Sequence, residues 1–460
     1  MERDPAGSGR SVGGLVSLQR RSVRVLVASQ ILGGVGVGAG VAVVSLLAYD
    51  LTGTASLSGV PPTATTVGAA AAALVIARIA VGSGRRPGLV TGYLVGALGA
   101  VLAVLAAVVG SFPLHVVAAF AFGWATASNL QARYAATDLA TDDRRASALS
   151  TVVWATTLGA VLGPNLTGVG SVAATALGLP DLAGPYVFSF VSFASAGLVQ
   201  AVLLRPDPLV VARQVAREDA AHEAARRPGA EAATDVQTTP TPGGATPVRQ
   251  GTVRGALHTI RSVPLAGAAL ASIAAAHATM VGVMVMTPVH MEHHGAALHL
   301  VGLTISLHVA GMYALSPVFG RLADAFGRRT VLLAGFAQLA LATVLAAGSA
   351  PVGGALFQVG LVLLGTGWSS CLIAGSALLT EVLTPDERPA AQGASDLVMN
   401  LAGALGGTLA GIVLALASYP ALAYGALALL VAPVWLVLRG EGPRGKVPAA
   451  VPGGSHPDSA

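Results

Sequence analysis

Residues 320–329 read Gly320-Arg321-Leu322-Ala323-Asp324-Ala325-Phe326-Gly327-Arg328-Arg329, and this stretch decides the fold. It is a glycine-bracketed turn between two apolar runs. Its carboxylate, Asp324, can meet a helix N-terminus, and its basic side chains can anchor at a lipid surface. A related turn at residues 77–86 keeps the second glycine and the arginine pair, but Val81 stands at the place of the carboxylate. One turn repeated in this way divides the chain into two similar halves.

The composition around these turns is that of a membrane protein. Of 460 residues 54% are hydrophobic and 10% are charged, whereas soluble domains have about 25% charged residues. Apolar runs of about 20 residues recur along the chain, long enough to cross a bilayer. They are continuous rather than alternating, so they indicate helices and not barrel strands. The sequence therefore predicts an all-α membrane protein with twelve transmembrane helices in two six-helix halves.

Changes in composition divide the chain into five segments. The first and last are a polar N-terminal segment, residues 1–22, and a Pro/Gly-rich tail, residues 439–460. The six-helix halves are residues 23–204 and residues 263–438, and residues 205–262 form a linker between them. The linker is rich in Arg, Glu, Asp, Thr and Pro, so we expect it to be largely disordered, with a short amphipathic helix near residues 208–226.

The arginines indicate how the chain crosses the membrane. They gather at the N-terminus, in every second inter-helix loop and in the tail, and the loops between contain none; these are residues 50–58, 111–114, 170–184, 289–299, 349–353 and 418–420. Since cytoplasmic loops carry the excess of positive charge, we expect a multi-pass protein of the cytoplasmic membrane with both termini, the linker and the tail cytoplasmic. The single cysteine excludes a disulfide framework.

Methionine and histidine gather in one window, residues 277–312, which holds five of the seven Met and six of the ten His. Met280 and Met284 are four residues apart, as are His308 and Met312, so each pair lies on one helical face. Three thioethers and an imidazole form a neutral, soft ligand set that suits Cu(I). The alternative is that Met fills the core and His hydrogen-bonds a neighbouring helix.

Further Met and His residues extend this candidate metal path. His277 lies one turn before Met280, and His290, Met291, His293 and His294 crowd the expected outer loop, where they could gather metal. A solvated loop without function is the alternative for that group.

Other polar or small residues within the spans are also candidates. Gly159, Gly163, Pro164 and Gly168 predict a kinked helix that packs closely on a neighbour. Arg133 and Asp138, at the end of the fourth span, are expected to form an ion pair with Arg144 or Arg145. We find no nucleophile, phosphate loop or paired-carboxylate constellation, so we expect no enzyme and no tightly bound cofactor.

The turn at residues 320–329 closely resembles the signature loop of the major facilitator superfamily. That resemblance implies the major facilitator fold, alternating access, and a conformational latch made by Gly320, Asp324, Gly327, Arg328 and Arg329. Residues 159–168 look like a motif of drug/proton antiporters. Met280-x-x-x-Met284 and His308-x-x-x-Met312 are similar to the paired motifs of the CcoA-like copper importers, which implies that these four residues bind copper.

The sequence thus predicts a secondary transporter that takes up copper by alternating access, with a copper chaperone or an oxidase-assembly factor as recipient. Its other partners are the lipid bilayer and the transported solute, and no nucleic acid is expected. Three alternatives stay open: proton-coupled efflux of drugs or small organic molecules, uptake of a vitamin or another small solute, and a non-transporting copper-binding receptor.

Overall fold

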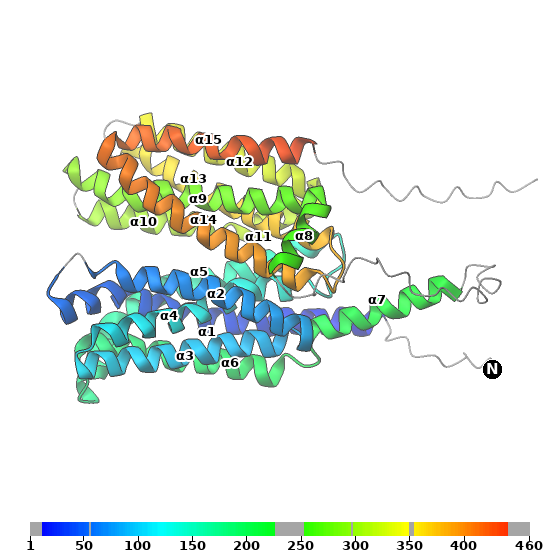
Figure 1. Ribbon diagram of the computed structural model, residues 1–460, viewed down its shortest axis with the longest axis horizontal. Helices are drawn as coiled ribbons and strands as arrows, with labels where there is room; N and C mark the ends of the chain where they lie inside the picture. Colours follow the sequence, from blue (N-terminus) through cyan, green and yellow to red (C-terminus); the bar gives the residue numbers. More distant parts are fainter. Residues whose placement is uncertain (1–11, 55–56, 226–252, 296–297, 349–353, 440–460) are drawn as a thin grey trace, which may run out of the picture.

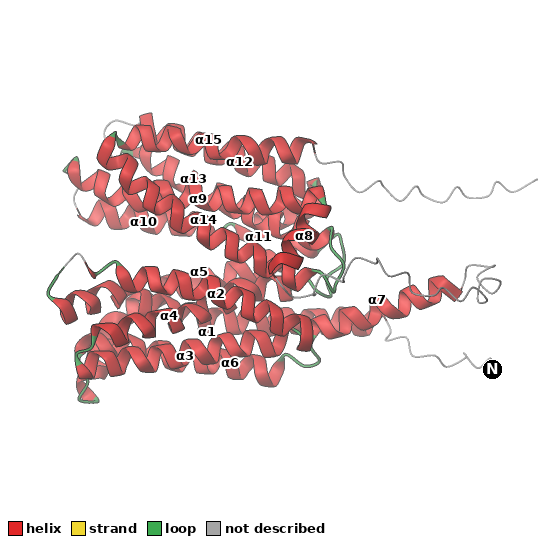
Figure 2. Cartoon of the chain, in the orientation of Figure 1, coloured by secondary structure: helices red, strands yellow, loops and turns green. Residues whose placement is uncertain are grey.

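The computed structural model describes residues 12–54, 57–225, 253–295, 298–348 and 354–439. These residues form helices joined by short turns, coloured red and green in Figure 2. The first half holds α1 (Val12–Thr52), α2 (Val60–Ser83), α3 (Arg85–Val109), α4 (Phe112–Ala135), α5 (Arg145–Ala176), a short 3-10 helix η2 (Asp181–Ala183) and α6 (Gly184–Leu203). Next come α7 (Pro208–Ala225) and α8 (Val253–Ser262). The second half holds α9 (Pro264–His293), α10 (Leu298–Tyr313), α11 (Ser316–Phe326), α12 (Arg328–Gly348), α13 (Ala355–Glu381), α14 (Arg388–Leu416) and α15 (Tyr419–Arg439).

The two halves are separate helical bundles that lie side by side, with α1–α6 below and α9–α15 above in Figure 1. Within the described residues ten helical runs are long and apolar enough to cross a membrane, with α10 and α11 together supplying one of them. The long helices α4 and α5 complete two bundles of six spans. The predicted all-α membrane fold with twelve spans in two halves is confirmed.

The halves meet mainly where α2 packs against α14 and where α11 packs against α5. The α2–α3 turn and the α11–α12 turn lie at the same end of the molecule, which we call the turn end. The described chain begins and finishes there too, and α7 extends away from the bundles at this end (Figure 1).

Glycines with positive φ set the two turns. Gly84 has φ 96° and Gly327 has φ 88°, values that other residues rarely adopt, so each helix stops there and the next begins at once. Residues 320–326, expected to be part of a turn, are instead the last helical residues of α11. The span that α10 and α11 form together is broken after Tyr313, because Pro317 cannot supply a backbone N–H to the helix.

Several segments begin or end away from their expected limits. Helix α1 starts at Val12, inside the polar N-terminal segment, and α9 continues to His293 through much of the expected outer loop. Helix α7 lies where the sequence predicts an amphipathic helix. The middle of the linker, residues 226–252, and the tail from residue 440 lie outside the described residues.

Small residues set how closely α1 and α5 approach. A Cβ added at Gly159 would lie 2.4 Å from the backbone carbon of Gly34, and one added at Gly163 would lie 2.6 Å from the Cα of Gly38. These two glycines of the predicted motif therefore act in helix packing. Pro164 and Gly168 lie on the same helix, and their side-chain surroundings are not described.

This packing predicts that Gly159→Leu destabilises the protein, because the added side chain would meet the backbone of α1. Overpacking of this kind costs about 1–3 kcal/mol, so the apparent Tm in detergent of a chain of 460 residues should fall by roughly 1–3 °C. Gly425→Leu on α15 is the control, since a Cβ there meets nothing within 4 Å. Equal Tm values for the two variants would contradict the packing described here.

Candidate functional site

A cavity of about 770 Å³ lies between the two halves. Its walls come from α1, α4 and α5 of the first half and from α10 and α13 of the second. Its polar and aromatic lining residues are Gln30, Thr126, Asn129, Arg133, Thr156, Thr157, Ser306, Tyr313 and Trp368. Because residues of both halves line it, relative movement of the halves must reshape it, as alternating access at a midplane site requires.

The aromatic side of the cavity is made by Tyr313 and Trp368. Tyr313 and Trp368 meet edge to face, with ring centroids 5.8 Å apart. The indole Nε1 of Trp368 donates a hydrogen bond of 2.9 Å to Nδ1 of His277. Since indole N–H only donates, this ring nitrogen of His277 must accept. His277 therefore holds Trp368 in place.

The opposite side offers hydrogen-bonding groups. Gln30 donates through Nε2 to the hydroxyl of Thr156 at 2.8 Å, and Asn129 accepts the hydroxyl proton of Tyr93 at 2.7 Å. The Oε1 of Gln30 and the hydroxyls of Thr126 and Thr157 are buried without a protein partner among the described residues. Buried polar atoms in that condition are suited to hydrogen-bond a ligand or water.

The cavity has one charged lining residue, Arg133, which is the lining residue of α4 nearest the turn end. Its Nη2 lies 2.5 Å from Oδ1 of Asp396 on α14, and both side chains are almost fully buried. Its Nε donates to the hydroxyl of Ser376 on α13 at 3.4 Å. The expected pairing of Arg133 with Asp138 and the Arg144–Arg145 turn is therefore wrong. Arg133 instead joins the first half to the second and seals the cavity towards the turn end.

A second buried ion pair lies behind this seal. Arg85, at the start of α3, binds both carboxylate oxygens of Asp138, at 2.8 and 3.0 Å. Its Nη2 also donates to Oε1 of Gln392 on α14 at 2.5 Å. The arginine that follows the Gly84 turn thus contacts the other half, although the turn itself has no acidic residue.

Asp324 lies at the N-terminus of α5, in the other half. Its two oxygens accept hydrogen bonds from the backbone N–H groups of Ala146 and Ser147, at 3.0 and 2.8 Å. A carboxylate at this position is stabilised by the unpaired N–H groups and the helix dipole.

The other residues of the expected latch support Asp324. Arg328 bridges Asp324 and Glu381 at 3.2 and 3.1 Å. Gly320 leaves room for α5, since its Cβ would lie 2.1 Å from the hydroxyl of Ser150. Gly327 forms the turn, and Arg329 donates to the carbonyl of Val437 at the end of α15. This geometry suits a latch that holds the halves together at the turn end.

The linker supplies contacts that the Val81 turn lacks. Asp207 accepts a hydrogen bond of 2.7 Å from the backbone N–H of Arg86, at the start of α3. Arg213 of α7 donates to the carbonyl of Val81 at 2.9 Å and lies 2.6 Å from Asp386, which precedes α14. Helix α7 thus bridges the two halves at the turn end.

The Met and His pairs do not line the cavity. Met280, Met284 and Met312 lie in the hydrophobic core of the second half, packed among other apolar side chains. Helix α10 packs against α13 and makes little contact with α9, which packs against α14, α15 and α13. The ring of His308 is buried and donates through Nδ1 to the carbonyl of Leu361 at 2.8 Å.

The outer Met and His residues are divided between core and surface. His290 stacks on Tyr419 with ring centroids 4.1 Å apart, and Met291 is fully buried. His294 is exposed, and its Nδ1 lies 2.9 Å from the carbonyl of His290. The side chain of His293 lies outside the described residues. No group of three or more His, Cys, Asp or Glu residues that could hold a metal occurs within the described part of the chain.

The fold and the sequence have known relatives. The family model described as Major Facilitator Superfamily matches residues 26–290 and 268–457. The chain belongs to the major facilitator superfamily. It is 40% identical over 420 residues to "Uncharacterized MFS-type transporter YddS" of Bacillus subtilis (strain 168), covering 91% of this chain and 90% of that protein. It is therefore a secondary transporter of the membrane and not an enzyme.

A transporter sequence and a solved structure are also similar to this chain. The chain is 28% identical over 380 residues to "Riboflavin transporter RfnT" of Brucella anthropi, covering 83% of this chain and 85% of that protein. Its fold is similar to a bacterial homologue of the iron transporter ferroportin in an outward-facing state, with a TM-score of 0.68 and 12% identity over 91% of this chain and 98% of that chain. That likeness concerns the fold alone.

Sequence reasoning missed what several polar residues of the spans do. Gln30, Asn129, Arg133 and Asp396 are visible as polar residues in apolar runs, which is a signal for function in membranes. Trp368 and Tyr313 carry no such signal, because aromatic residues are ordinary constituents of membrane helices.

The Asp324 contact predicts that Asp324→Asn loosens the turn end, because it removes a negative charge bound to two backbone N–H groups. Hydrogen bonds to charged groups contribute about 1.5–3 kcal/mol each. Maleimide should therefore alkylate a cysteine placed at Ser376, in a Cys371→Ala background, about tenfold faster in the variant. Asp219→Asn, on the exposed part of α7, is the control. Unchanged alkylation would show that Asp324 does not hold the halves together.

The contact between Arg213 of α7 and Asp386 predicts a smaller increase in the alkylation rate when it is removed. Arg213→Ala and Asp386→Ala should each speed alkylation of the same cysteine by about two- to fivefold, because the pair is partly exposed and such pairs contribute at most about 1 kcal/mol. The exchanged pair, Arg213→Asp with Asp386→Arg, should restore the slow rate. Additive effects in a double-mutant cycle would exclude a direct interaction.

Proposed function

We propose that this transporter carries a small, uncharged organic solute with a flat aromatic face, and that riboflavin is the first candidate. The observation that carries the proposal is the charge balance of the cavity. Arg133 is its one charged lining residue, and Asp396 neutralises it at 2.5 Å. A charged solute would have no free counter-charge there and would lose its hydration on entry.

The lining also fits the shape and polarity of such a solute. Trp368 and Tyr313 offer apolar aromatic surface, while Gln30, Thr126 and Thr157 offer unpaired polar atoms. Ligand sites of this kind combine an apolar wall with a few polar groups that fix orientation. Similarity to a protein named as a riboflavin transporter supports the same class of solute.

We place the turn end at the cytoplasm, because the arginines of the chain gather in the turns at this end, in the linker and in the tail. The cavity is then closed towards the cytoplasm by Arg133–Asp396 and by Asp324, an outward-facing arrangement. Both termini are cytoplasmic in this orientation. Uptake follows if solute enters from outside and is released when these contacts break. Proton-coupled efflux would use the same cavity in the opposite direction.

Copper uptake is the second candidate, and one observation favours it. The Nε2 of His308 is buried and has no partner among the described residues, so its lone pair is available. His115 on α4 weighs against this reading: its Nε2 lies 2.9 Å from the carbonyl of Val44, and its Nδ1 is likewise buried without a partner. Copper as a transported solute would imply the chaperone or oxidase-assembly recipient predicted from the sequence.

Riboflavin uptake into proteoliposomes tests the first candidate. Trp368→Ala should lower uptake at subsaturating riboflavin by about tenfold, since loss of one aromatic stacking partner costs about 1–3 kcal/mol. Trp368→Phe should retain most of the activity, and Trp435→Ala, at an exposed tryptophan of α15, should leave uptake unchanged. No riboflavin uptake by the unaltered protein in either direction would reject riboflavin as the solute.

Copper content separates the two candidates. If His308 binds copper, His308→Gln should lower the Cu(I) bound per purified protein, whereas His115→Gln should leave it unchanged. Under our first proposal the two variants bind equally little copper. Inductively coupled plasma mass spectrometry of protein loaded with Cu(I) under reducing conditions measures the ratio.

A further inference from the structure

Helix α1 is longer than a membrane span requires. Its 41 residues extend about 60 Å at about 1.5 Å per residue, whereas the hydrocarbon core of a bilayer is about 30 Å thick. The surplus lies at the N-terminal, turn end, where Gln19 donates through Nε2 to the carbonyl of Ala136 at 2.7 Å. The first turns of α1 are thereby fixed beside the end of α4, in the part of the helix that exceeds the thickness of the hydrocarbon core.

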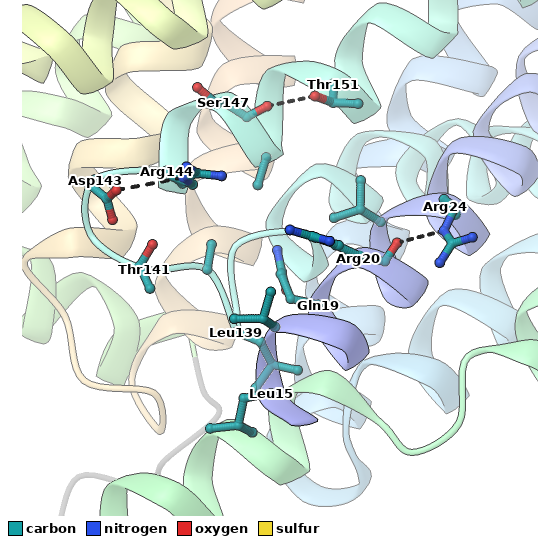
Figure 3. Close-up of a pocket in the computed structure, with 14 residues that line it drawn as sticks. Leu15, Gln19, Arg20, Arg24, Leu139, Thr141, Asp143, Arg144, Ser147 and Thr151 are labelled. Carbon is teal, nitrogen blue, oxygen red and sulfur yellow. Dashed lines mark hydrogen bonds and ion pairs between the residues drawn. The ribbon is translucent and has the colours of Figure 1, made fainter. Parts of the chain in front are cut away.

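A second cavity, of about 920 Å³, opens beside this extension (Figure 3). One wall is the first turns of α1. The other is the α4–α5 turn and the first turns of α5. The apolar lining side chains are Leu15, Val16, Val23, Leu139, Ala140 and Ala148. None of the residues that line the central cavity takes part in it, so the two cavities are separate.

The charged groups of this cavity are three arginines and one aspartate: Arg20, Arg24, Arg144 and Asp143. Asp143 lies 3.8 Å from Arg144, and both side chains are largely exposed. Arg24 is held against α1 by a 3.3 Å hydrogen bond from its Nε to the carbonyl of Arg20. In Figure 3, Arg20 and Arg144 reach towards the space between α1 and the start of α5. Among the described residues no carboxylate pairs with Arg20 or Arg24, so the cavity keeps a net positive charge.

An apolar wall beside an excess of guanidinium groups suits one kind of ligand. Guanidinium binds phosphate through paired hydrogen bonds, and an acyl chain covers exposed apolar surface. A free phosphate would leave Leu15, Val16 and Val23 in contact with water, and a zwitterionic lipid would add an ammonium group to a site that is already positive. The cytoplasmic leaflet is where anionic lipids meet basic side chains.

We propose that the cavity between α1 and the α4–α5 turn binds the headgroup of an anionic phospholipid. Arg20 and Arg144 bind the phosphate, and the apolar side chains of α1 contact the first part of an acyl chain. The lipid lies beside Ser147, whose backbone N–H is one of the two that bind Asp324. This site is independent of which solute the central cavity carries.

Native mass spectrometry of the full-length protein with added phosphatidylglycerol or phosphatidylethanolamine tests the proposal. The unaltered protein should retain one phosphatidylglycerol more tightly than phosphatidylethanolamine. The Arg20→Gln, Arg144→Gln double variant should lose about thirtyfold in phosphatidylglycerol affinity, since each arginine near a lipid surface contributes about 1 kcal/mol. The matched control is Arg205→Gln with Arg217→Gln, two exposed arginines outside the cavity that should leave affinity unchanged.

Three results would overturn the proposal. Equal retention of the two lipids would remove the charge preference. An equal loss of affinity in the control double variant would make the effect one of total charge. Displacement of phosphatidylglycerol by millimolar inorganic phosphate, with no loss of affinity in Leu15→Ser, would show a site for a free anion and not for a lipid.

Discussion

The buried contact between Arg133 and Asp396 is the constraint on which the rest of the structure depends. The two side chains come from opposite halves and lie 2.5 Å apart with almost no exposure. An unpaired charge at such a place costs about 3–5 kcal/mol. The halves therefore stay together at the turn end unless the pair separates with compensation from water, a proton or a solute. The same pair removes net charge from the central cavity, so one interaction both closes the path and favours an uncharged solute.

The two halves use different means to close the turn end. In the second half the turn itself contributes, because Asp324 binds the N-terminus of α5. In the first half Val81 occupies the corresponding place, and contacts with the other half come from Arg85 through Gln392 and from Arg213 through Asp386. The two halves thus share the same arrangement of helices but differ in the contacts that close the turn end. Helix α7 of the linker, which lies where the sequence predicts a short amphipathic helix, carries part of that role.

The sequence predicted the features that depend on residues close together along the chain. Hydropathy gives the spans, and glycine at 84 and 327 gives the turns, because both act within a few residues. The sequence also predicted that Asp324 can contact a helix N-terminus, although it did not predict that the helix is α5. The partner of Arg133 was not, since Asp396 lies 263 residues away and only packing brings them together. The Met and His spacing correctly places each pair on one helical face. Spacing does not tell which neighbour that face meets, and here the methionines lie in the core of the second half.

The most direct test of this account is the distance between the halves at the turn end. Spin labels at Ser83→Cys and Thr330→Cys, exposed positions in opposite halves, report it by double electron–electron resonance. The account predicts one short distance in the unaltered protein and a longer second population in Asp396→Asn, because Arg133 then loses its buried counter-charge. An unchanged distance distribution in Asp396→Asn and in Arg133→Gln would contradict the claim that this pair holds the turn end closed.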